Sequence, residues 1–268
     1  MSGGRPLALV VDGRRLEAEW HGPAPQEGPA IVFLHEGLGS VSAWRDFPAR
    51  VSAQTGLGAL VYSRLGYGAS DPAPLPRPLT YMQDEARSSL PAVLDAAGVR
   101  DAVLFGHSDG GSIAIVFAGS GLPQASRVRG MVLEAPHVFV EDVSVRSIAA
   151  ARDAYATTDL RARLARHQGA NVDVAFRGWN DAWLDPAFRA WNIERYLPKV
   201  RAPSLVVQGE EDAYGTLAQV DAIERGSGAS VTRLVLPRCG HAPHRDRADD
   251  VLAAVVAFLR GLGLYPRP

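Results

Sequence analysis

Short apolar runs recur along the chain and are separated by longer stretches that mix apolar and polar residues. The run at residues 30–34 is apolar on both faces, which is typical of a central strand buried in a sheet. The predicted strands are residues 30–34, 59–63, 102–105, 129–135, 203–208 and 231–236. Because they alternate with helical patterns, we expect an α/β fold with a mostly parallel sheet covered by helices on both faces.

The stretches between these runs predict helices at residues 43–54, 80–97, 217–225 and 247–260. Thr80, with Gln83 three residues on, predicts a cap at the start of the second helix, and Pro91 should kink or divide it. Near the start of the chain, Asp12-Gly13 separates two β-prone runs and predicts a hairpin. We expect this hairpin to add an antiparallel edge to the sheet.

Residues 137–199 interrupt this alternation. They carry no signal for a central strand, are rich in arginine, and contain Trp179, Trp183 and Trp191. An insert between two strands is most simply a cap over the carboxyl edge of the sheet, where open α/β sheets bind ligands. We therefore predict a core formed by residues 1–136 and 200–268 and a helical cap formed by residues 137–199.

The length, net charge and cysteine content of the chain limit the classes of partner and the compartment that we expect. The 268 residues suffice for one large α/β domain with an insertion, and the formal net charge is −1. No basic patch suggests nucleic acid or an anionic membrane, and no apolar run is long enough to cross a bilayer. The single cysteine, Cys239, fits a reducing compartment, and the first residues show no secretory signal. We expect a cytoplasmic protein, monomeric or homodimeric, with a small-molecule substrate.

The stretch Gly106-His107-Ser108-Asp109-Gly110 lies between an apolar run and a helical pattern. Strand, sharp turn and helix with serine at the apex make up the nucleophile elbow, G-x-S-x-G. The glycines are needed because the strained turn passes close to neighbouring backbone. We therefore expect Ser108 to act as a nucleophile.

A serine hydroxyl needs a base, and the base needs an orienting carboxylate. His241 follows the last predicted strand and is the expected base. The other candidates are His244 on the same loop, His137 at the start of the insert, and His107, whose side chain should point away from Ser108.

Asp212 ends the preceding strand region and is the expected acid. Glu210 and Glu211 are local rivals that we expect to be solvated, and Glu134 is an alternative at the end of an earlier strand.

A tetrahedral intermediate needs two backbone N–H donors that face its oxyanion. The residue after the nucleophile, Asp109, supplies one of them. We expect the other from the glycine-rich loop after the first buried strand, residues 35–39, with Gly37 as the donor or, failing that, Leu38. Neither a metal nor an organic cofactor is required for this chemistry.

With these pieces the chain resembles the α/β-hydrolase family from residue 30 to residue 260, and the order Ser, acid, His is that of the family. The chain departs from it at Glu36, where a glycine is usual, and at Asp109, where an apolar residue is frequent. We expect Asp109 to turn to the first N–H groups of its own helix, and Glu36 to turn to Arg64 or to backbone. The alternative is that one of these carboxyls has a raised pKa and handles a polar substrate group or a proton.

The resemblance implies hydrolysis of an ester, thioester or lactone through an acyl-enzyme. The alternative is hydrolysis of a carbon–carbon bond in a diketone-type ring-fission product, which similar capped relatives perform with the same triad. Relatives that open epoxides or remove halogens use an aspartate nucleophile, but Asp109 does not occupy the apex of the elbow. A ligand-binding protein without turnover, an amidase and a perhydrolase are further alternatives.

Substrate contacts are expected from residues of the insert and of the neighbouring loops. The aromatic residues of the insert predict either an aromatic pocket or a packed helical core, and arginines could bind an anionic substrate end. The candidate residues are Glu36, Arg64, His137, Trp179 and Trp183.

Overall fold

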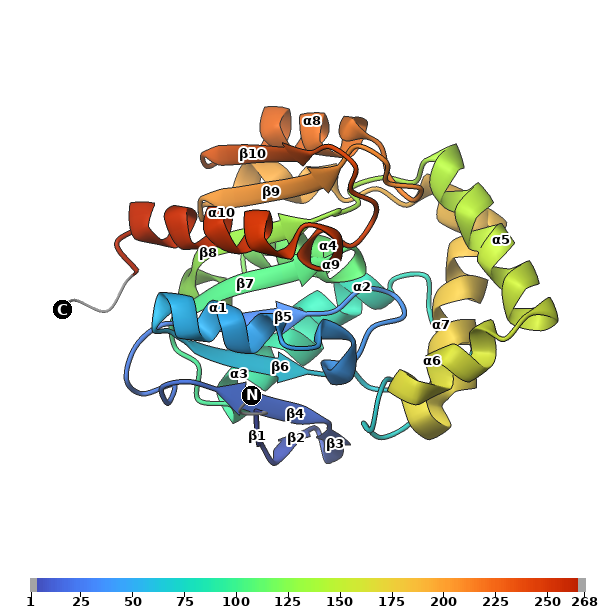
Figure 1. Cartoon of the computed structure of the whole chain (residues 1–268), viewed down its shortest axis with the longest axis horizontal. Helices are drawn as coiled ribbons and strands as arrows, with labels where there is room; N and C mark the ends of the chain where they lie inside the picture. Colours follow the sequence, from blue (N-terminus) through green and yellow to red (C-terminus); the bar gives the residue numbers. More distant parts are fainter. Residues whose placement is uncertain (1–3, 265–268) are drawn as a thin grey trace.

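The computed structural model describes residues 4–264, and its centre is an eight-stranded sheet of order β1-β4-β6-β5-β7-β8-β9-β10 (Figure 1). The pairs from β6 to β10 are parallel, whereas β1 and β4 run antiparallel at one edge. The strands are β1 (Arg5–Pro6), β4 (Ala18–His21), β5 (Ala30–Leu34), β6 (Gly58–Tyr62), β7 (Ala102–His107), β8 (Val128–Glu134), β9 (Ser204–Gly209) and β10 (Val231–Leu236). The predicted parallel α/β sheet is confirmed.

Helices cover both faces of this sheet. The helices outside the insert are α1 (Phe47–Thr55), α2 (Tyr81–Asp84), α3 (Leu90–Ala96), α4 (Asp109–Ala118), α8 (Leu217–Gly226), α9 (Pro243–Asp246) and α10 (Ala248–Gly261). Alternate side chains of β5 enter two separate cores: Ile31 and Phe33 pack with α1 and α10, and Val32 and Leu34 pack with α3 and α4. This two-sided burial explains why the run at 30–34 has no polar face.

The insert is helical, as predicted. It comprises α5 (Asp142–Thr157), α6 (Leu160–Gln168), α7 (Val172–Leu184) and short 3₁₀ turns, and it lies beyond the carboxyl ends of the strands (Figure 1). Trp183, Phe188 and Trp191 pack against one another with ring centroids 5.0 to 6.1 Å apart, and Phe188 stacks on Trp191. Part of the aromatic content of the insert is therefore packed core.

Two local predictions need correction. The hairpin at Asp12-Gly13 exists, with both residues at positive φ, but its strands β2 (Leu9–Val11) and β3 (Arg14–Leu16) form a separate two-stranded sheet. The antiparallel edge is made by β1 and β4 instead. Thr80 does not cap its helix through its side chain, because its hydroxyl donates to the Asp84 carboxylate.

The predicted helix at 80–97 is divided, as Pro91 suggested. A π-helical turn, Glu85–Ser89, separates α2 from α3, and Pro91 falls in the first turn of α3. The backbone stays helical through this turn, with the Leu90 N–H donating to the Glu85 carbonyl, so the proline is accommodated at a wider turn rather than at a break in the chain. No helix within residues 4–264 has the length and apolar character needed to cross a membrane.

We predict that Gly110→Ala lowers the free energy of unfolding by about 3 kcal/mol, because an added Cβ forces overpacking against fixed backbone. That Cβ would lie 1.9 Å from the Leu34 carbonyl oxygen. Denaturant unfolding followed by circular dichroism measures the change. The matched control is Gly28→Ala, whose Cβ would meet no atom within 4 Å. Equal midpoints for the two variants would contradict the packing argument.

Candidate active site

Ser108 lies at the apex of the turn between β7 and α4. Its backbone is strained, with φ 53° and ψ −117°, and its N–H donates to the Glu134 carbonyl at 2.8 Å. A Cβ on Gly106 would lie 2.4 Å from the Gly110 carbonyl oxygen. The turn is therefore tight enough to require both glycines, and it holds the serine at the carboxyl edge of the sheet.

His241 and Asp212 contact each other across two loops at the same edge. The His241 Nδ1 lies 2.8 and 2.9 Å from the two carboxylate oxygens of Asp212. A carboxylate only accepts hydrogen bonds, so Nδ1–H donates and Nε2 is the basic nitrogen. Glu210 and Glu211, the local rivals for the acid, are exposed, as expected.

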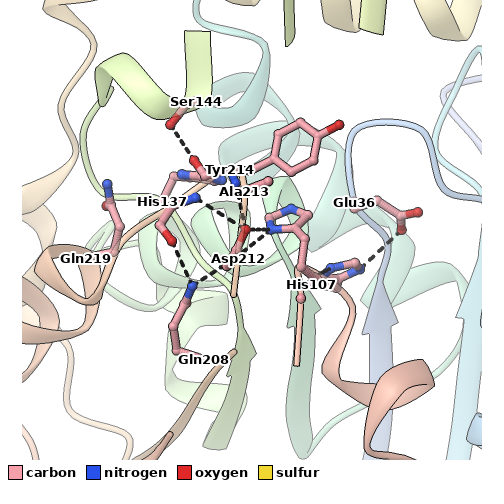
Figure 2. A network of polar contacts seen from close by, with 12 residues as sticks. Glu36, His107, His137, Ser144, Gln208, Asp212, Ala213, Tyr214 and Gln219 are labelled. Atoms are coloured by element: carbon pink, nitrogen blue, oxygen red, sulfur yellow. Dashed lines mark hydrogen bonds and ion pairs between the residues drawn. The ribbon is translucent and has the colours of Figure 1, made fainter. Parts of the chain in front are cut away.

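The Asp212 carboxylate is held by further donors. It accepts hydrogen bonds from the Gln208 side-chain amide at 2.7 Å and from the Tyr214 N–H at 2.7 Å (Figure 2). Burial would raise the pKa of Asp212, but the bonds to His241 and to the Tyr214 N–H outweigh it and lower that pKa. The carboxylate is thus ionised and fixed in direction.

Ser108 and His241 line one cavity of about 210 Å³. Glu36, Gly37 and Leu38 form part of its wall, and His137, Trp179, Trp183 and Tyr214 form another part. Of the predicted substrate contacts, Glu36, His137, Trp179 and Trp183 therefore meet at this cavity.

Arg64 does not line the cavity, which contradicts its predicted role in substrate binding. Its guanidinium is buried and donates to the carbonyls of His35 at 2.5 Å and of Glu36 at 3.0 Å. A surface arginine could reach a ligand, but this one supports the loop at residues 35–39 from behind.

The loop at residues 35–39 has four of its five carbonyls, those of His35, Glu36, Leu38 and Gly39, engaged as hydrogen-bond acceptors. Gln168, at the end of α6, donates to the carbonyls of Leu38 at 2.7 Å and Gly39 at 3.0 Å. Within residues 4–264, the N–H groups of Gly37 and Leu38 donate to no acceptor. Gly37 packs against the Trp179 indole, since a Cβ there would lie 2.2 Å from it. The arrangement leaves donors of this loop available to an anion.

The Asp109 side chain does not turn to its own helix, so that expectation is wrong. Its carboxylate accepts a hydrogen bond from the Tyr81 hydroxyl at 2.5 Å, and the Tyr81 oxygen accepts one from the Trp183 indole at 3.0 Å. Burial raises the pKa of Asp109, and Arg64 opposes this shift. The carboxyl faces a buried network behind the serine, away from the cavity.

Glu36 also departs from expectation, because its carboxylate turns to His107 and not to Arg64 or backbone. Glu36 Oε2 lies 3.4 Å from His107 Nδ1 (Figure 2). Burial would raise the pKa of Glu36, but His107 holds it well below its ordinary value. Burial would lower the pKa of His107, but Glu36 raises it to about 9. Each shift favours the charged form of its group.

Glu134 and His244, the alternative acid and base, pair with each other. His244 Nδ1 lies 2.7 Å from Glu134 Oε2, both side chains are buried, and the imidazole packs against Trp44 with centroids 4.7 Å apart. Neither residue lines the cavity. The structure thus separates the Asp212–His241 pair from the Glu134–His244 pair, and of these four residues His241 shares the cavity wall with Ser108.

His137 is buried and neutral. Burial, followed by the neighbouring His241, lowers its pKa to about 3. Its ring lies 5.2 Å from that of Trp183, and its Nδ1 has no hydrogen-bond partner among the described residues. It is a polar group in a wall that also contains the aromatic side chains of Trp179, Trp183 and Tyr214.

Several supporting residues were not singled out from the sequence. Gln168 and Tyr81 bind groups 130 and 28 residues away, and Gln208 lies inside a buried strand. A buried glutamine in an apolar strand was the one local clue, because it must find a partner. Among the described residues, no group of three or more His, Cys, Asp or Glu side chains could hold a metal ion.

Comparison with known proteins places this site in context. Residues 31–255 match the model of the α/β-hydrolase family. A curated relative, epoxide hydrolase B of Mycobacterium tuberculosis, is 31% identical over 112 residues, which are 41% of this chain and 30% of the relative. The chain therefore matches less than a third of that relative's length.

Solved structures share the fold across nearly the whole chain. A hydrolase from Pseudomonas aeruginosa superposes with a TM-score of 0.72 at 21% identity, over 96% of this chain and 98% of the other. A 2-hydroxy-6-oxo-6-phenylhexa-2,4-dienoate hydrolase from Rhodococcus gives 0.75 at 16% identity, over 96% and 98%. An enol-lactonase from Burkholderia xenovorans gives 0.68 at 22% identity, over 93% and 98%. At sequence identities this low, the structural likeness shows a shared fold and does not extend to the substrate.

We predict that Tyr81→Phe lowers the free energy of unfolding by about 1–3 kcal/mol, the usual cost of leaving buried polar groups unpaired. The variant removes the donor to Asp109 and the acceptor for the Trp183 indole. Thermal and denaturant unfolding measure it. Tyr214→Phe is the control, because the Tyr214 hydroxyl makes no hydrogen bond within residues 4–264. If both substitutions lower the free energy of unfolding equally, the loss does not come from the hydrogen bonds that join Asp109, Tyr81 and Trp183.

Proposed function

The chain belongs to the α/β-hydrolase family, and we propose that it is a serine hydrolase that cleaves a carboxylic ester, thioester or lactone of a small substrate. One observation carries this proposal. Ser108, at the strained apex of its turn, lines the same cavity as His241, and the Nδ1 of His241 lies 2.8 Å from Asp212. Serine hydrolysis requires a nucleophile, a general base and an orienting acid, and these three residues can supply them.

In the proposed mechanism, Nε2 of His241 takes the proton of the Ser108 hydroxyl as its oxygen attacks the substrate carbonyl. The N–H groups of Asp109 and Gly37, with Leu38 in reserve, hold the oxyanion. Asp212 keeps His241 in the correct tautomer and stabilises the imidazolium. The protonated His241 then releases the alcohol or thiol, and water activated by His241 hydrolyses the acyl-enzyme. No cofactor takes part.

We further propose that residues 137–199 act as a cap on a core formed by residues 1–136 and 200–268. The cap supplies Trp179, Trp183 and His137 to the cavity wall. A dry cavity of about 150 Å³ accepts a benzene ring, so a cavity of about 210 Å³ accommodates a ring with a short side chain. The favoured substrates are therefore small and apolar or aromatic.

Serine chemistry is favoured over the epoxide opening for which the Mycobacterium relative is named. An aspartate nucleophile would have to occupy the elbow apex, but the residue there is Ser108. The Asp109 carboxylate is engaged by Tyr81. Hydrolysis of a carbon–carbon bond in a diketone would use the same three residues, and a substrate panel distinguishes it from ester cleavage.

We predict that a fluorophosphonate probe labels the wild-type protein once, at Ser108, and that Ser108→Ala abolishes the labelling. Turnover of short aryl esters should fall by at least about 10³-fold in this variant, since the nucleophile is lost. Intact-protein mass and a panel of esters, thioesters, lactones, epoxides and diketones measure both effects. Ser126→Ala, on an exposed turn remote from the cavity, is the control. A folded wild-type protein that is not labelled contradicts serine catalysis.

We predict that Asp212→Asn lowers kcat for the best ester by about 10³–10⁴-fold, because His241 loses its tautomer and its counter-charge. KM should change much less, since the Asp212 side chain is not part of the cavity wall. Steady-state kinetics measure both constants. Glu211→Gln is the matched control, because that carboxylate is exposed, and it should retain wild-type rates. Equal losses in the two variants would rule out Asp212 as the acid.

A further inference from the structure

The side chain of His107 bridges the two loops that flank Ser108. Its Nε2 donates to the backbone carbonyl of His241 at 2.6 Å, and its Nδ1 lies 3.4 Å from the Glu36 carboxylate. His107 itself is the residue before Ser108 and is buried. One imidazole therefore contacts the loop of the expected base and the loop of the expected oxyanion donors, from within the elbow.

The Nε2 of His107 makes the hydrogen bond to the His241 carbonyl, whereas its Nδ1 makes no hydrogen bond among the described residues and has the Glu36 carboxylate as its charged neighbour at 3.4 Å. A protonated ring would place a positive charge directly beside this carboxylate. The Glu36 carboxylate raises the pKa of His107 to about 9, against burial. The other titratable groups that pack on this ring are His241 and His244, with centroids 5.2 and 5.1 Å away, and Glu134 beyond His244.

The charge of His107 matters because of where Glu36 lies. Glu36 precedes Gly37, lines the cavity, and stands where the family usually has glycine. An unpaired carboxylate at this position would repel the oxyanion that develops on the substrate oxygen held by the neighbouring N–H groups. It would also favour the protonated form of His241. A cation beside Glu36 removes both penalties.

We propose that Glu36 and His107 form a positioning pair that neutralises charge beside the oxyanion donors and fixes the oxyanion loop and the His241 loop relative to Ser108. Neither side chain is proposed to react with the substrate. This inference rests on the proposed serine hydrolase function. It explains how a carboxylate is tolerated at residue 36.

The test uses the variants His107→Gln, Glu36→Gln and the double substitution. Glutamine at 107 retains an amide donor that reaches the His241 carbonyl but carries no charge, so Glu36 is left unpaired. For His107→Gln we expect kcat to fall about 10- to 100-fold with KM changed less than about threefold. The acidic limb of the kcat/KM profile should move to higher pH.

The double variant decides between a charge pair and two independent structural contributions. Once the carboxylate is also removed, we expect most of the kcat lost in His107→Gln to return, and the acidic limb to move back. Losses that multiply in the double variant, or a pH profile unchanged in His107→Gln, would overturn the proposal. Glu19→Gln is the matched control, because it breaks a carboxylate–imidazole pair remote from the cavity, in which Glu19 Oε1 lies 2.9 Å from His21 Nε2. This control should change neither kcat nor the pH profile.

A second measurement does not depend on activity. Nitrogen NMR of the histidine rings should show His107 of the wild-type protein protonated on both nitrogens at pH 7.5, and deprotonated on one of them in Glu36→Gln. A neutral His107 in the wild-type protein would overturn the pair even if the kinetic variants failed to fold. Failure of the serine hydrolase proposal is seen separately, as the absence of fluorophosphonate labelling in the wild-type protein.

Discussion

The close approach of backbone segments at the elbow is the constraint on which the rest of the site depends. Ser108 holds a strained conformation because β7 and α4 meet at an angle that leaves no room for side chains at Gly106 and Gly110. Strain of this kind persists only when the surrounding structure over-determines it. Here the parallel strands on both sides of β7 and two separate apolar cores provide that rigidity. The loops that follow β5, β9 and β10 then converge on the serine.

Carboxyl and imidazole groups around the elbow are arranged in pairs. Asp212 binds His241, Glu134 binds His244, and Glu36 contacts His107, with the three imidazole rings close together. An isolated buried charge is costly, so carboxylates in such number require partners. Asp109 differs from these carboxylates because its partners are the hydroxyl of Tyr81 and, at longer range, Arg64, instead of an imidazole. The polar surroundings of the serine are therefore one connected system rather than a set of separate residues.

The sequence predicted most of the elements because their signals are local. Apolar runs identified six strands within a residue or two, Pro91 indicated the division of its helix, and the glycine spacing indicated the turn at Ser108. Predictions failed where a polar side chain had a choice of partners. Thr80 donates to the Asp84 side chain instead of capping the helix backbone, and Arg64 supports a loop instead of lining the cavity. The carboxyls of Glu36 and Asp109 turn to side chains that the sequence did not indicate as their partners.

The sequence by itself determined the order of the strands and helices, the residue at the apex of the elbow, and the placement of a histidine and an aspartate after late strands. These follow from periodicity and from glycine and proline chemistry, which act over a few residues. Only the tertiary structure decided that His107 lies against the carbonyl of His241, 134 residues away, and that Gln168 holds the loop at residues 35–39. The partner of a buried polar group depends on which backbone segments the folded sheet brings within about 3 Å, and no local pattern carries that information.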